Sequence, residues 1–487
     1  MTEIATGQIV FSGSEDKSSA QLGGAMPLVI NAITDSVGAV RRRPGISLWS
    51  SFPAAAASGS PVIGMSPFGS TLVYVTEDRL LHAISPSGEI LELSSTDATT
   101  RLDGGVRPSF VQGRNMLAIA GGGAIQKWSG TGLSERLQNT GTGGPPPEAT
   151  HISGIAQRLV AKVANGTAQI WWSAPLEQYE NWDMVTGGAS YIQASAKPDP
   201  LTSLYDNTNE VFAFGSMTLQ VFIPSNLAVD ANDPNNLLDF APSRTLNIGT
   251  LANSGVVPID DAFGVPDRYR RIIITDGRSY NDISKSIAYI LQGMQGFDEC
   301  WGFRIRFGRF DCLAWMFPSD GYGIIWDANQ GCWAEWRSWL RGEKDIAITS
   351  AYHWPEYNLF LIGMSDGSIA KLDDQVSTDL GDPIRIVIVS GFSNYGKQSL
   401  KLSRTVRFVM KRAGAITATS GHVRFSYRND EGSWFVARDI PLGDDPNPTI
   451  TIRSLGTFRI RQWKVEYTGS DEFQLIRATE EFENLEG

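Results

Sequence analysis

The chain has 487 residues, of which 42% are hydrophobic, so it can bury a sizeable core and global disorder is excluded. The net charge of −11 is unevenly placed: residues 381–487 hold 15 Lys and Arg against 13 Asp and Glu, which leaves 26 against 39 in residues 1–380. Phosphate contacts need Lys and Arg, so an acidic body argues against a tight DNA-binding surface, although DNA can still pass nearby without binding.

The N-terminal segment 1–11 has an acidic residue early and no basic stretch before an apolar one, so we expect no secretory signal. No apolar run reaches about 18 residues, so we expect no membrane span. Cys300, Cys312 and Cys332 are an odd number without a disulfide framework. We therefore expect reduced thiols in a protein made in a cytoplasm.

A pattern of two apolar strands around a short turn returns roughly every 40–50 residues, a period typical of propeller blades. The seven instances are 70–84, 115–128, 158–172, 210–223, 269–283, 310–327 and 357–372. The fifth is the weakest because its second strand is polar, so the pattern predicts six or seven blades. Three turns carry Asn165-Gly166, Asp276-Gly277 and Asp366-Gly367, the dipeptides that favour hairpins through positive φ.

Residues 152–163 fit two patterns. Ile152, Ile155, Leu159 and Val163 fall at helical spacing. The same stretch alternates and then turns at Asn-Gly into a second alternating run, and this hairpin accounts for more residues. We therefore predict a hairpin here.

The chain changes character near residue 380. The polar segment 375–383 is typical of a linker, which predicts a β-propeller domain over 1–380 and a β-sandwich-like domain over 381–487. In the second domain, strands such as 404–412 alternate between apolar and basic side chains, as in a half-exposed antiparallel sheet. The alternation of apolar and polar residues shifts by one position at Gln462, so we predict a β-bulge there.

Segment 26–49, which contains Pro27, Asn31, an arginine run and Pro44-Gly45, resembles the packaged-DNA stabilisation or tail-hub proteins of short-tailed phages. The likeness continues through 152–161, 201–222 and 324–336, and covers most of residues 26–375. The likeness lies in the order of these segments and in the kinds of residues they contain, and no single motif is diagnostic.

The resemblance implies a virion protein made in the cytoplasm of a bacterial host. In the family, six propeller-containing subunits form a homohexameric ring, the tail nozzle or hub, below the portal and its adaptor. The ring retains packaged DNA, forms the exit channel for DNA ejection, and carries the tail needle or tip and the spikes or fibres. Double-stranded DNA would pass through transiently. Arg41, Arg42 and Arg43 could touch phosphate, pair with acidic neighbours or form a solvated strand end. Because Pro44-Gly45 follows them directly, a subunit contact is favoured, and residues 1–45 are a candidate strand or arm at such contacts.

Several motifs have a competing chemical interpretation. Gly363 to Gly367 spells a G-x-S-x-G elbow around Ser365, but a strand follows instead of the required helix, so a hairpin turn is favoured. The three cysteines are too widely spaced for a zinc pair, and buried thiols are favoured. The loop from Asp230 to Asp239 is rich in oxygen ligands but lacks the Gly and Glu of an EF-hand, which favours a surface loop over a calcium site.

Four tryptophans crowd one stretch of the chain: Trp326, Trp333, Trp336 and Trp339. Exposed, they would stack on sugars or bases; wedged between blades, they would supply buried area, and this second interpretation is favoured.

The sequence thus predicts a non-enzymatic phage tail protein with no catalytic residues, no cofactor and no metal ligands. The alternatives are a β-propeller that binds or cleaves glycans, and a monomeric propeller scaffold for protein partners.

Overall fold

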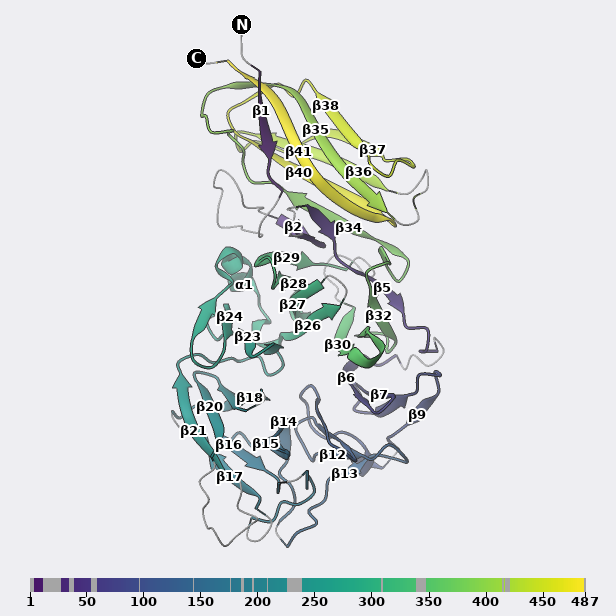
Figure 1. Cartoon of the computed structure of the whole chain (residues 1–487), viewed down its shortest axis with the longest axis vertical. Coiled ribbons are helices and arrows are strands. Elements are labelled where there is room, and N and C mark those ends of the chain that lie inside the picture. The colour runs from purple at the N-terminus through teal and green to yellow at the C-terminus, as the bar shows by residue number, and fades with distance from the viewer. Residues whose placement is uncertain are drawn as a thin grey trace.

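The computed structural model shows a ring of β-sheets below a second β-structure, with both chain termini at the top (Figure 1). It describes residues 4–11, 28–34, 39–53, 59–95, 97–142, 144–175, 177–184, 188–194, 197–207, 209–225, 239–307, 310–338, 347–413, 416 and 421–485.

Seven four-stranded antiparallel units form the ring within the described part of the chain, so the fold is a β-propeller, as predicted. Blades 1 to 3 are β6 (Val62–Phe68), β7 (Thr71–Thr76), β8 (Leu81–Ile84) and β9 (Ile90–Glu92); β10 (Ser109–Gln112), β11 (Leu117–Ala120), β12 (Gln126–Trp128) and β13 (Glu135–Arg136); β14 (Ala149–Ile155), β15 (Arg158–Val163), β16 (Gln169–Trp172) and β17 (Ser190–Gln193).

Blades 4 to 7 complete the ring. They are β18 (Leu201–Asp206), β19 (Val211–Gly215), β20 (Leu219–Ser225) and β21 (Asp239–Leu246); β22 (Val257–Ile259), β23 (Ala262–Pro266), β24 (Ile272–Thr275) and β25 (Tyr280–Asp282); β26 (Trp301–Phe307), β27 (Phe310–Phe317), β28 (Tyr322–Asp327) and β29 (Cys332–Trp336); β30 (Ile348–Trp354), β31 (Leu359–Met364), β32 (Ile369–Asp373) and β5 (Gly45–Leu48).

Helices are few and short in the described residues. They are α1 (Ala288–Gly293) and the 3₁₀ turns η2 (Ala98–Thr100), η3 (Lys285–Ile287), η4 (Phe297–Glu299), η5 (Pro318–Asp320) and η6 (Pro355–Tyr357). None of these helices is both long and apolar enough to cross a membrane.

Glycine residues form the three hairpin turns that the sequence predicted. Gly166, Gly277 and Gly367 have φ of 75°, 75° and 85°, the left-handed region that glycine enters without strain, so all three predicted turns are confirmed. Residues 152–163 form the hairpin of β14 and β15, and the helical interpretation is excluded.

Apolar packing between neighbouring blades holds the ring together. Each of the seven blade-to-blade interfaces has its own cluster of buried side chains in the described part of the molecule. Between blades 3 and 4, Trp172 meets Phe240 with ring centroids 5.0 Å apart, and between blades 4 and 5, Phe212 meets Phe263 at 4.7 Å. The propeller therefore has a distributed core, one part per interface.

The N-terminal part of the chain closes the ring. Strand β5 is the fourth strand of blade 7, where Ile46 pairs with Leu372. The closing strand thus comes from a segment more than 300 residues from its partner, so separating the ends of the propeller would require breaking this sheet.

Above the ring lies a structure that we call the two-sheet unit, made of strands β1 to β4 and β34 to β41. One sheet contains β1 (Ile4–Ile9), β3 (Ala32–Thr34), β4 (Val40–Arg42), β35 (Lys401–Ala413), β38 (Thr449–Arg453), β39 (Thr457–Phe458) and β41 (Glu472–Asn484). The other contains β2 (Leu28–Ile30), β34 (Asp382–Val389), β36 (His422–Asn429), β37 (Phe435–Pro441) and β40 (Arg461–Gly469).

The two sheets share one buried apolar cluster. Phe408 on β35 stacks on Phe425 of β36 with centroids 4.3 Å apart and meets Trp463 of β40 at 5.1 Å. The second sheet runs on into blades 6 and 7, because β2 pairs with β29 and β34 pairs with β33 (Thr378–Asp379), which pairs with β5. The β-sandwich expected for 381–487 therefore stays an interpretation.

N-terminal strands are built into the two-sheet unit. Strand β1 pairs with β41 over Ile4 to Ile9, and β2 pairs with β34. Within segment 375–383, Asp379 is buried in strand β33. The domain boundary expected after residue 380 stays a prediction.

The bulge predicted at Gln462 is wrong. Phe458 belongs to β39, which pairs with β35 in one sheet, whereas Gln462 belongs to β40, which pairs with β36 in the other sheet without a register shift. The apolar phase slips because the chain changes sheets between these two strands.

Candidate functional site

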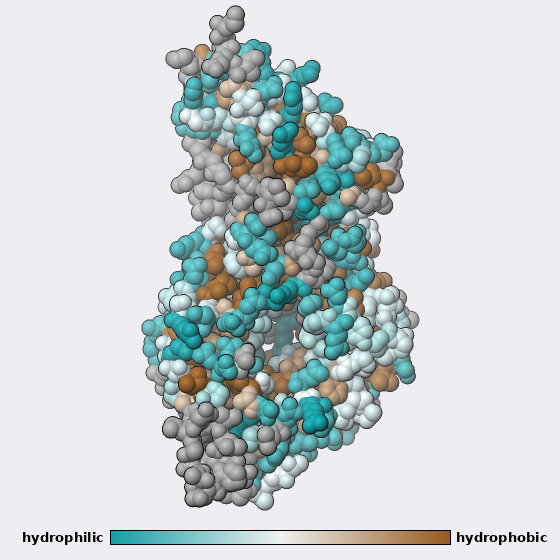
Figure 2. All heavy atoms as spheres, viewed as in Figure 1, coloured by the Kyte–Doolittle hydropathy of each residue, from teal (hydrophilic) through white to brown (hydrophobic). Residues whose placement is uncertain are grey.

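An axial cavity of about 550 Å³ lies where the inner strands of the blades converge. Its walls come from β6, β10, β14, β18, β22, β26 and β30 and from the segment before β22. Figure 2 shows the surface hollowed at the centre of the ring. The volume is in the range of small-molecule pockets. A DNA duplex, whose major groove alone is about 12 Å wide, is too large for this cavity.

Arg107 is the principal cation of the cavity and comes just before β10. Its Nη1 donates to the carbonyl oxygens of Ile63 in blade 1, at 3.3 Å, and Thr349 in blade 7, at 2.5 Å. Its guanidinium also lies 4.6 Å from the ring centroid of Trp301 in blade 6. Burial lowers the pKa of Arg107 to about 10, and the side chain ties blades 1, 2, 6 and 7 together across the axis.

His151 on β14 is buried at the same cavity. Burial, with Lys162 nearby, lowers the pKa of His151 to about 4, so the ring is neutral at pH 7. Nε2 lies 2.9 Å from the carbonyl oxygen of Asn253, which makes Nε2 the protonated nitrogen. Lys162 donates to the Thr150 hydroxyl at 2.7 Å, and burial lowers the pKa of Lys162 to about 8.

Asp206 supplies the negative charge of the cavity, at the end of β18. It accepts a short hydrogen bond from the Ser153 hydroxyl, and burial raises the pKa of Asp206. Ile152 donates its N–H to Ser109, so Arg107, two residues before Ser109, lies about three residues from Asp206 along the axis.

Sequence reasoning did not find these axial residues. Arg107 is a single arginine before a proline, and nothing local distinguishes it from the other arginines of the chain. Its position depends on blades 1, 6 and 7, which are far from it in the sequence.

The predicted arginine run lies at the junction of the two parts of the molecule, where Arg43 is buried. Nη1 of Arg43 donates to Oδ1 of Asp379 at 3.0 Å and Nη2 to Oδ2 at 2.5 Å, with the two side chains 0% and 4% exposed. Nε donates to Oδ1 of Asn31 at 2.9 Å, and the same oxygen accepts the N–H of Arg337 at 2.9 Å. The guanidinium lies 4.6 Å from the centroid of Trp336.

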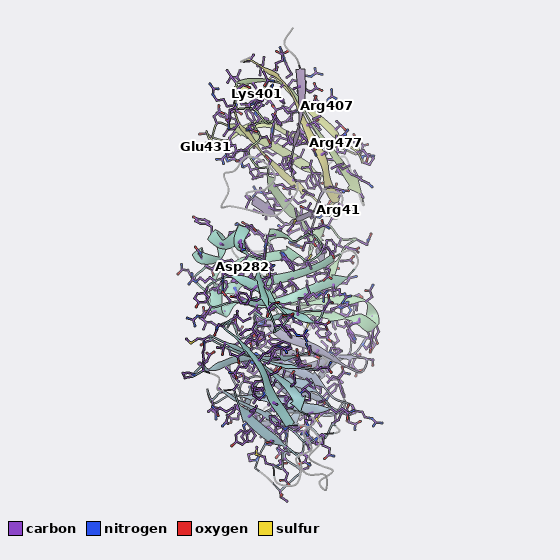
Figure 3. All side chains as sticks on the ribbon, turned by 60° about the vertical axis from the view of Figure 1, so that its left-hand side comes forward. Arg41, Asp282, Lys401, Arg407, Glu431 and Arg477 are labelled. Carbon is purple, nitrogen blue, oxygen red and sulfur yellow. The ribbon has the colours of Figure 1, made fainter. Side chains whose placement is uncertain are left out.

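The other two arginines of the run differ in exposure. Arg42 is buried and donates to the carbonyl oxygen of Ser377 at 2.7 Å, and burial lowers its pKa to about 10. Arg41 lies 3.9 Å from Glu472 and its side chain is 27% exposed. In Figure 3, Arg41 lies below Arg407 and Arg477 on the two-sheet unit. All three arginines have partners within this chain, so the subunit contact expected for Arg41, Arg42 and Arg43 stays a prediction.

The tryptophan stretch behaves as predicted. Trp333 belongs to the cluster between blades 5 and 6, Trp326 packs against that cluster, and Trp336 belongs to the cluster between blades 6 and 7. Wedging between blades is therefore confirmed for these residues. Trp339 lies outside the described residues.

The remaining motifs have structural roles where they are described. Ser365 follows β31 in the turn to β32, as predicted for a hairpin. Cys300 and Cys312 are buried and Cys332 half-buried, and burial raises the pKa of all three thiols. Within the described ranges, no group of three His, Cys, Asp or Glu is placed to hold a metal ion. The oxygen-rich loop before β21 falls outside those ranges.

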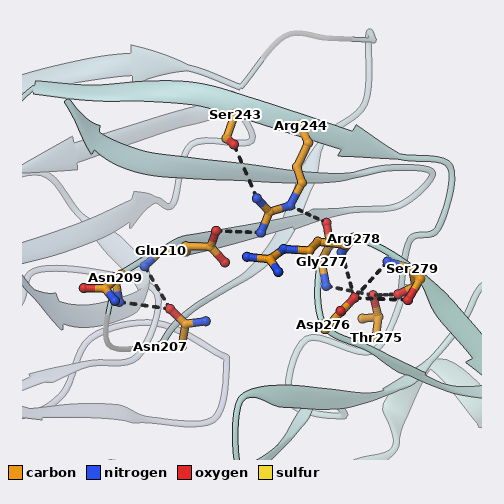
Figure 4. Close-up of polar contacts among 10 residues, drawn as sticks. All are labelled: Asn207, Asn209, Glu210, Ser243, Arg244, Thr275, Asp276, Gly277, Arg278 and Ser279. Atoms are coloured by element: carbon orange, nitrogen blue, oxygen red, sulfur yellow. Dashed lines mark hydrogen bonds and ion pairs between the residues drawn. The ribbon is translucent and has the colours of Figure 1, made fainter.

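A polar groove between blades 4 and 5 is a second hollow, with a volume of about 730 Å³. Figure 4 shows the polar contacts at and beside it. Arg244 on β21 crosses from one blade to the other. Its Nη2 donates to Oε1 of Glu210 at 2.6 Å, and its Nε donates to the carbonyl oxygen of Gly277 in the hairpin turn of blade 5, also at 2.6 Å. Because Arg244 binds both Glu210 in blade 4 and Gly277 in blade 5, this side chain, beside the groove, helps to hold the two blades in register.

Residues 72–293, a little under half of the chain, match the model of a phage stabilisation family described as Bacteriophage P22 Gp10, beta-propeller. The resemblance to phage stabilisation proteins is confirmed. The matched residues run from blade 1 to the end of α1, so the family resemblance rests on the propeller. The family is a phage structural family, and the match therefore supports a structural protein of the virion.

Other comparisons add little. No curated protein matches the chain. Solved structures with similarity include the computationally designed Ika8 protein, with 14% identity, a TM-score of 0.37, and coverage of 68% of this chain and 99% of that one. They also include BBS1N in complex with ARL6DN, with 12% identity, a TM-score of 0.40, and coverage of 68% of this chain and 97% of that one. A third is the extracellular domain of the putative hybrid two-component system BT3049 from B. thetaiotaomicron. It has 11% identity and a TM-score of 0.42, and the match covers 82% of this chain and 48% of that one. All three TM-scores are below 0.5, so these structures indicate no function for this chain.

Proposed function

We propose that the chain is a nozzle or hub protein of a short phage tail. Six copies form a ring below the portal and its adaptor, retain the packaged DNA and surround the path by which it leaves. The observation that carries this proposal is the family match over 72–293.

The axial cavity supports a particular placement of the DNA path. At about 550 Å³ it is too small for a duplex, so the exit channel runs along the axis of the ring of subunits and not through a propeller. The excess of acidic residues in 1–380 suits such a channel, because an acidic wall repels phosphates and lets the duplex slide. Retention then depends on a narrow passage and on a needle or tip that closes it.

Deletion of the gene tests this function directly. Particles that lack the chain should package DNA and then lose it, leaving empty heads, and supplying the wild-type chain should restore full heads. If particles without the chain hold their genomes as well as wild-type particles do, the nozzle assignment is wrong.

One observation favours carbohydrate binding as a second candidate function. Trp171 and Tyr191, paired across β16 and β17, stack with centroids 5.5 Å apart, and Tyr191 is 49% exposed. Stacked aromatic rings of this kind can bind the face of a sugar. Soaking with host polysaccharide fragments would test this: a sugar bound at Trp171 supports it, and unchanged binding by a Trp171→Ala variant excludes it.

A further inference from the structure

The guanidinium of Arg107 is only partly used by the protein. Nη1 has two hydrogens and donates to two carbonyl oxygens, of Ile63 and Thr349. Nε and Nη2 have no hydrogen-bond partner, and no carboxylate pairs with Arg107, in the part of the chain that the structure describes. Three N–H donors therefore remain available.

These donors lie at a cavity, not in a packed core. Arg107 and Trp301 both line the axial space of about 550 Å³. Glu77 attracts the Arg107 guanidinium at a distance but forms no ion pair with it among the described residues. A half-buried cation without a paired carboxylate costs free energy, and stacking on Trp301 offsets only part of that cost. By contrast, the buried Arg43 at the junction has Asp379 as its partner.

We propose that Arg107 anchors a binding site for a small oxyanion, a carboxylate or a phosphate group, in the axial cavity of the propeller. Nε and Nη2 form the planar fork that binds two oxygens of one such group in parallel hydrogen bonds. Trp301 fixes the plane of the fork, and the carbonyl oxygens of Ile63 and Thr349 fix its direction.

The charges around the cavity favour an anion at this end. Asp206, the acidic group of the cavity lining, accepts a hydrogen bond from Ser153 and does not pair with Arg107 among the described residues. Lys162 lies beside His151, and its charge helps to lower the pKa of that histidine. Neutral His151 adds no repulsion and no charge.

Calorimetric titration of the full chain with sodium acetate and with inorganic phosphate, at ionic strength held constant with chloride, tests the site. Wild type should bind at least one of the two anions saturably. Arg107→Lys keeps the charge and removes the fork, and should weaken binding by about tenfold or more, or about 1.4 kcal/mol. The matched control is Arg79→Lys: Arg79 donates to the carbonyl oxygen of Val106 at 2.6 Å but does not line the cavity, so affinity should stay within about twofold.

The two probes separate the sources of the oxyanion. Phosphate binding that is about tenfold tighter than acetate binding indicates a phosphate-bearing ligand, and equal or tighter acetate binding indicates a carboxylate. Saturation by neither anion, or equal binding by Arg107→Lys, overturns the proposal.

A second measurement needs no variant. Wild-type crystals soaked in bromoacetate should show the bromine signal in the axial cavity next to Arg107, whereas bromine only elsewhere would contradict the site. The outcome does not bear on the nozzle proposal, which rests on assembly and genome retention.

Discussion

The propeller and the two-sheet unit bury charge in different ways. In the two-sheet unit, the ion pairs Arg412–Asp471 and Arg461–Glu480 have both side chains 0% exposed. In the propeller, the pairs of the described residues keep at least one partner in contact with solvent, as in Arg244–Glu210, at 24% and 15%. The junction resembles the two-sheet unit, with Arg43–Asp379 at 0% and 4%.

The difference follows from how each part is built. Neighbouring blades are joined by apolar clusters, one per interface in the described part of the chain, and ion pairs such as Arg244–Glu210 lie beside them with access to solvent. In the two-sheet unit, Glu480 on β41 points into the molecule and needs partners from several strands. A buried pair fixes geometry at a cost in desolvation, so its loss is expected to be expensive while its net contribution is small.

The largest effect is expected at Arg461. Arg461→Met leaves Glu480 buried with only Tyr395, at 2.8 Å, and Ser403, at 2.5 Å, as donors. We expect a loss of about 3–5 kcal/mol in the free energy of unfolding, measured by chemical denaturation.

The matched control for that variant is Arg244→Met in the propeller. There Glu210 keeps access to water, so the loss should be about 1–2 kcal/mol. Equal losses in the two variants would show that the comparison between the two parts is mistaken.

A somewhat smaller effect is expected at the junction. Arg43→Met removes the partner of Asp379 and the donor to Asn31, at a cost of about 3 kcal/mol. Limited proteolysis should then cut near residue 380 faster than in wild type, separating residues 381–487 from the rest of the chain under denaturing conditions. Unchanged cutting in a folded variant would argue that the boundary after residue 380 has no mechanical meaning.

Acid should destabilise the propeller through His151. Its folded pKa is about 4 and its unfolded value about 6.5, so the unfolded chain takes up the proton first. Stability is therefore lost as the pH falls from about 6.5 to 4, by up to about 3 kcal/mol. His151→Gln keeps a donor for Asn253 and should flatten the profile in this range, measured as unfolding free energy against pH. A profile as steep as that of wild type would assign the acid sensitivity to other groups.

The smallest effect is expected at Ser365. Its hydroxyl is buried without a hydrogen-bond partner among the described residues, so Ser365→Ala removes an unsatisfied group. Stability should change by less than about 0.5 kcal/mol, and phage titre should stay within about twofold. A loss of titre by orders of magnitude with folding intact would instead point to chemistry at this hydroxyl.

The sequence pattern found the blades because their middle strands are buried on both faces. In six blades the predicted hairpin is formed by the second and third strands, such as β15 with β16. In blade 5 it is the third and fourth strands, β24 and β25, and the exposed Tyr280 on β25 explains why that repeat looked polar.

Other features depend on contacts that no local pattern contains. The pairing of β5 with β32 joins residues far apart in the sequence. The apolar phase at Gln462 changed because the chain moved to another sheet, and a bulge would leave the same pattern in the sequence. Nothing in the local sequence distinguishes Arg43 and Arg107 from other arginines, because their carbonyl and aromatic neighbours come from distant parts of the chain.

Electron microscopy of purified particles tests the central claim most directly. The account predicts six copies of a seven-bladed propeller in a ring below the portal and its adaptor, with the DNA path on the axis of the ring and no DNA inside any propeller. Particles in which this chain is absent, or present without ring symmetry at the tail, would contradict it.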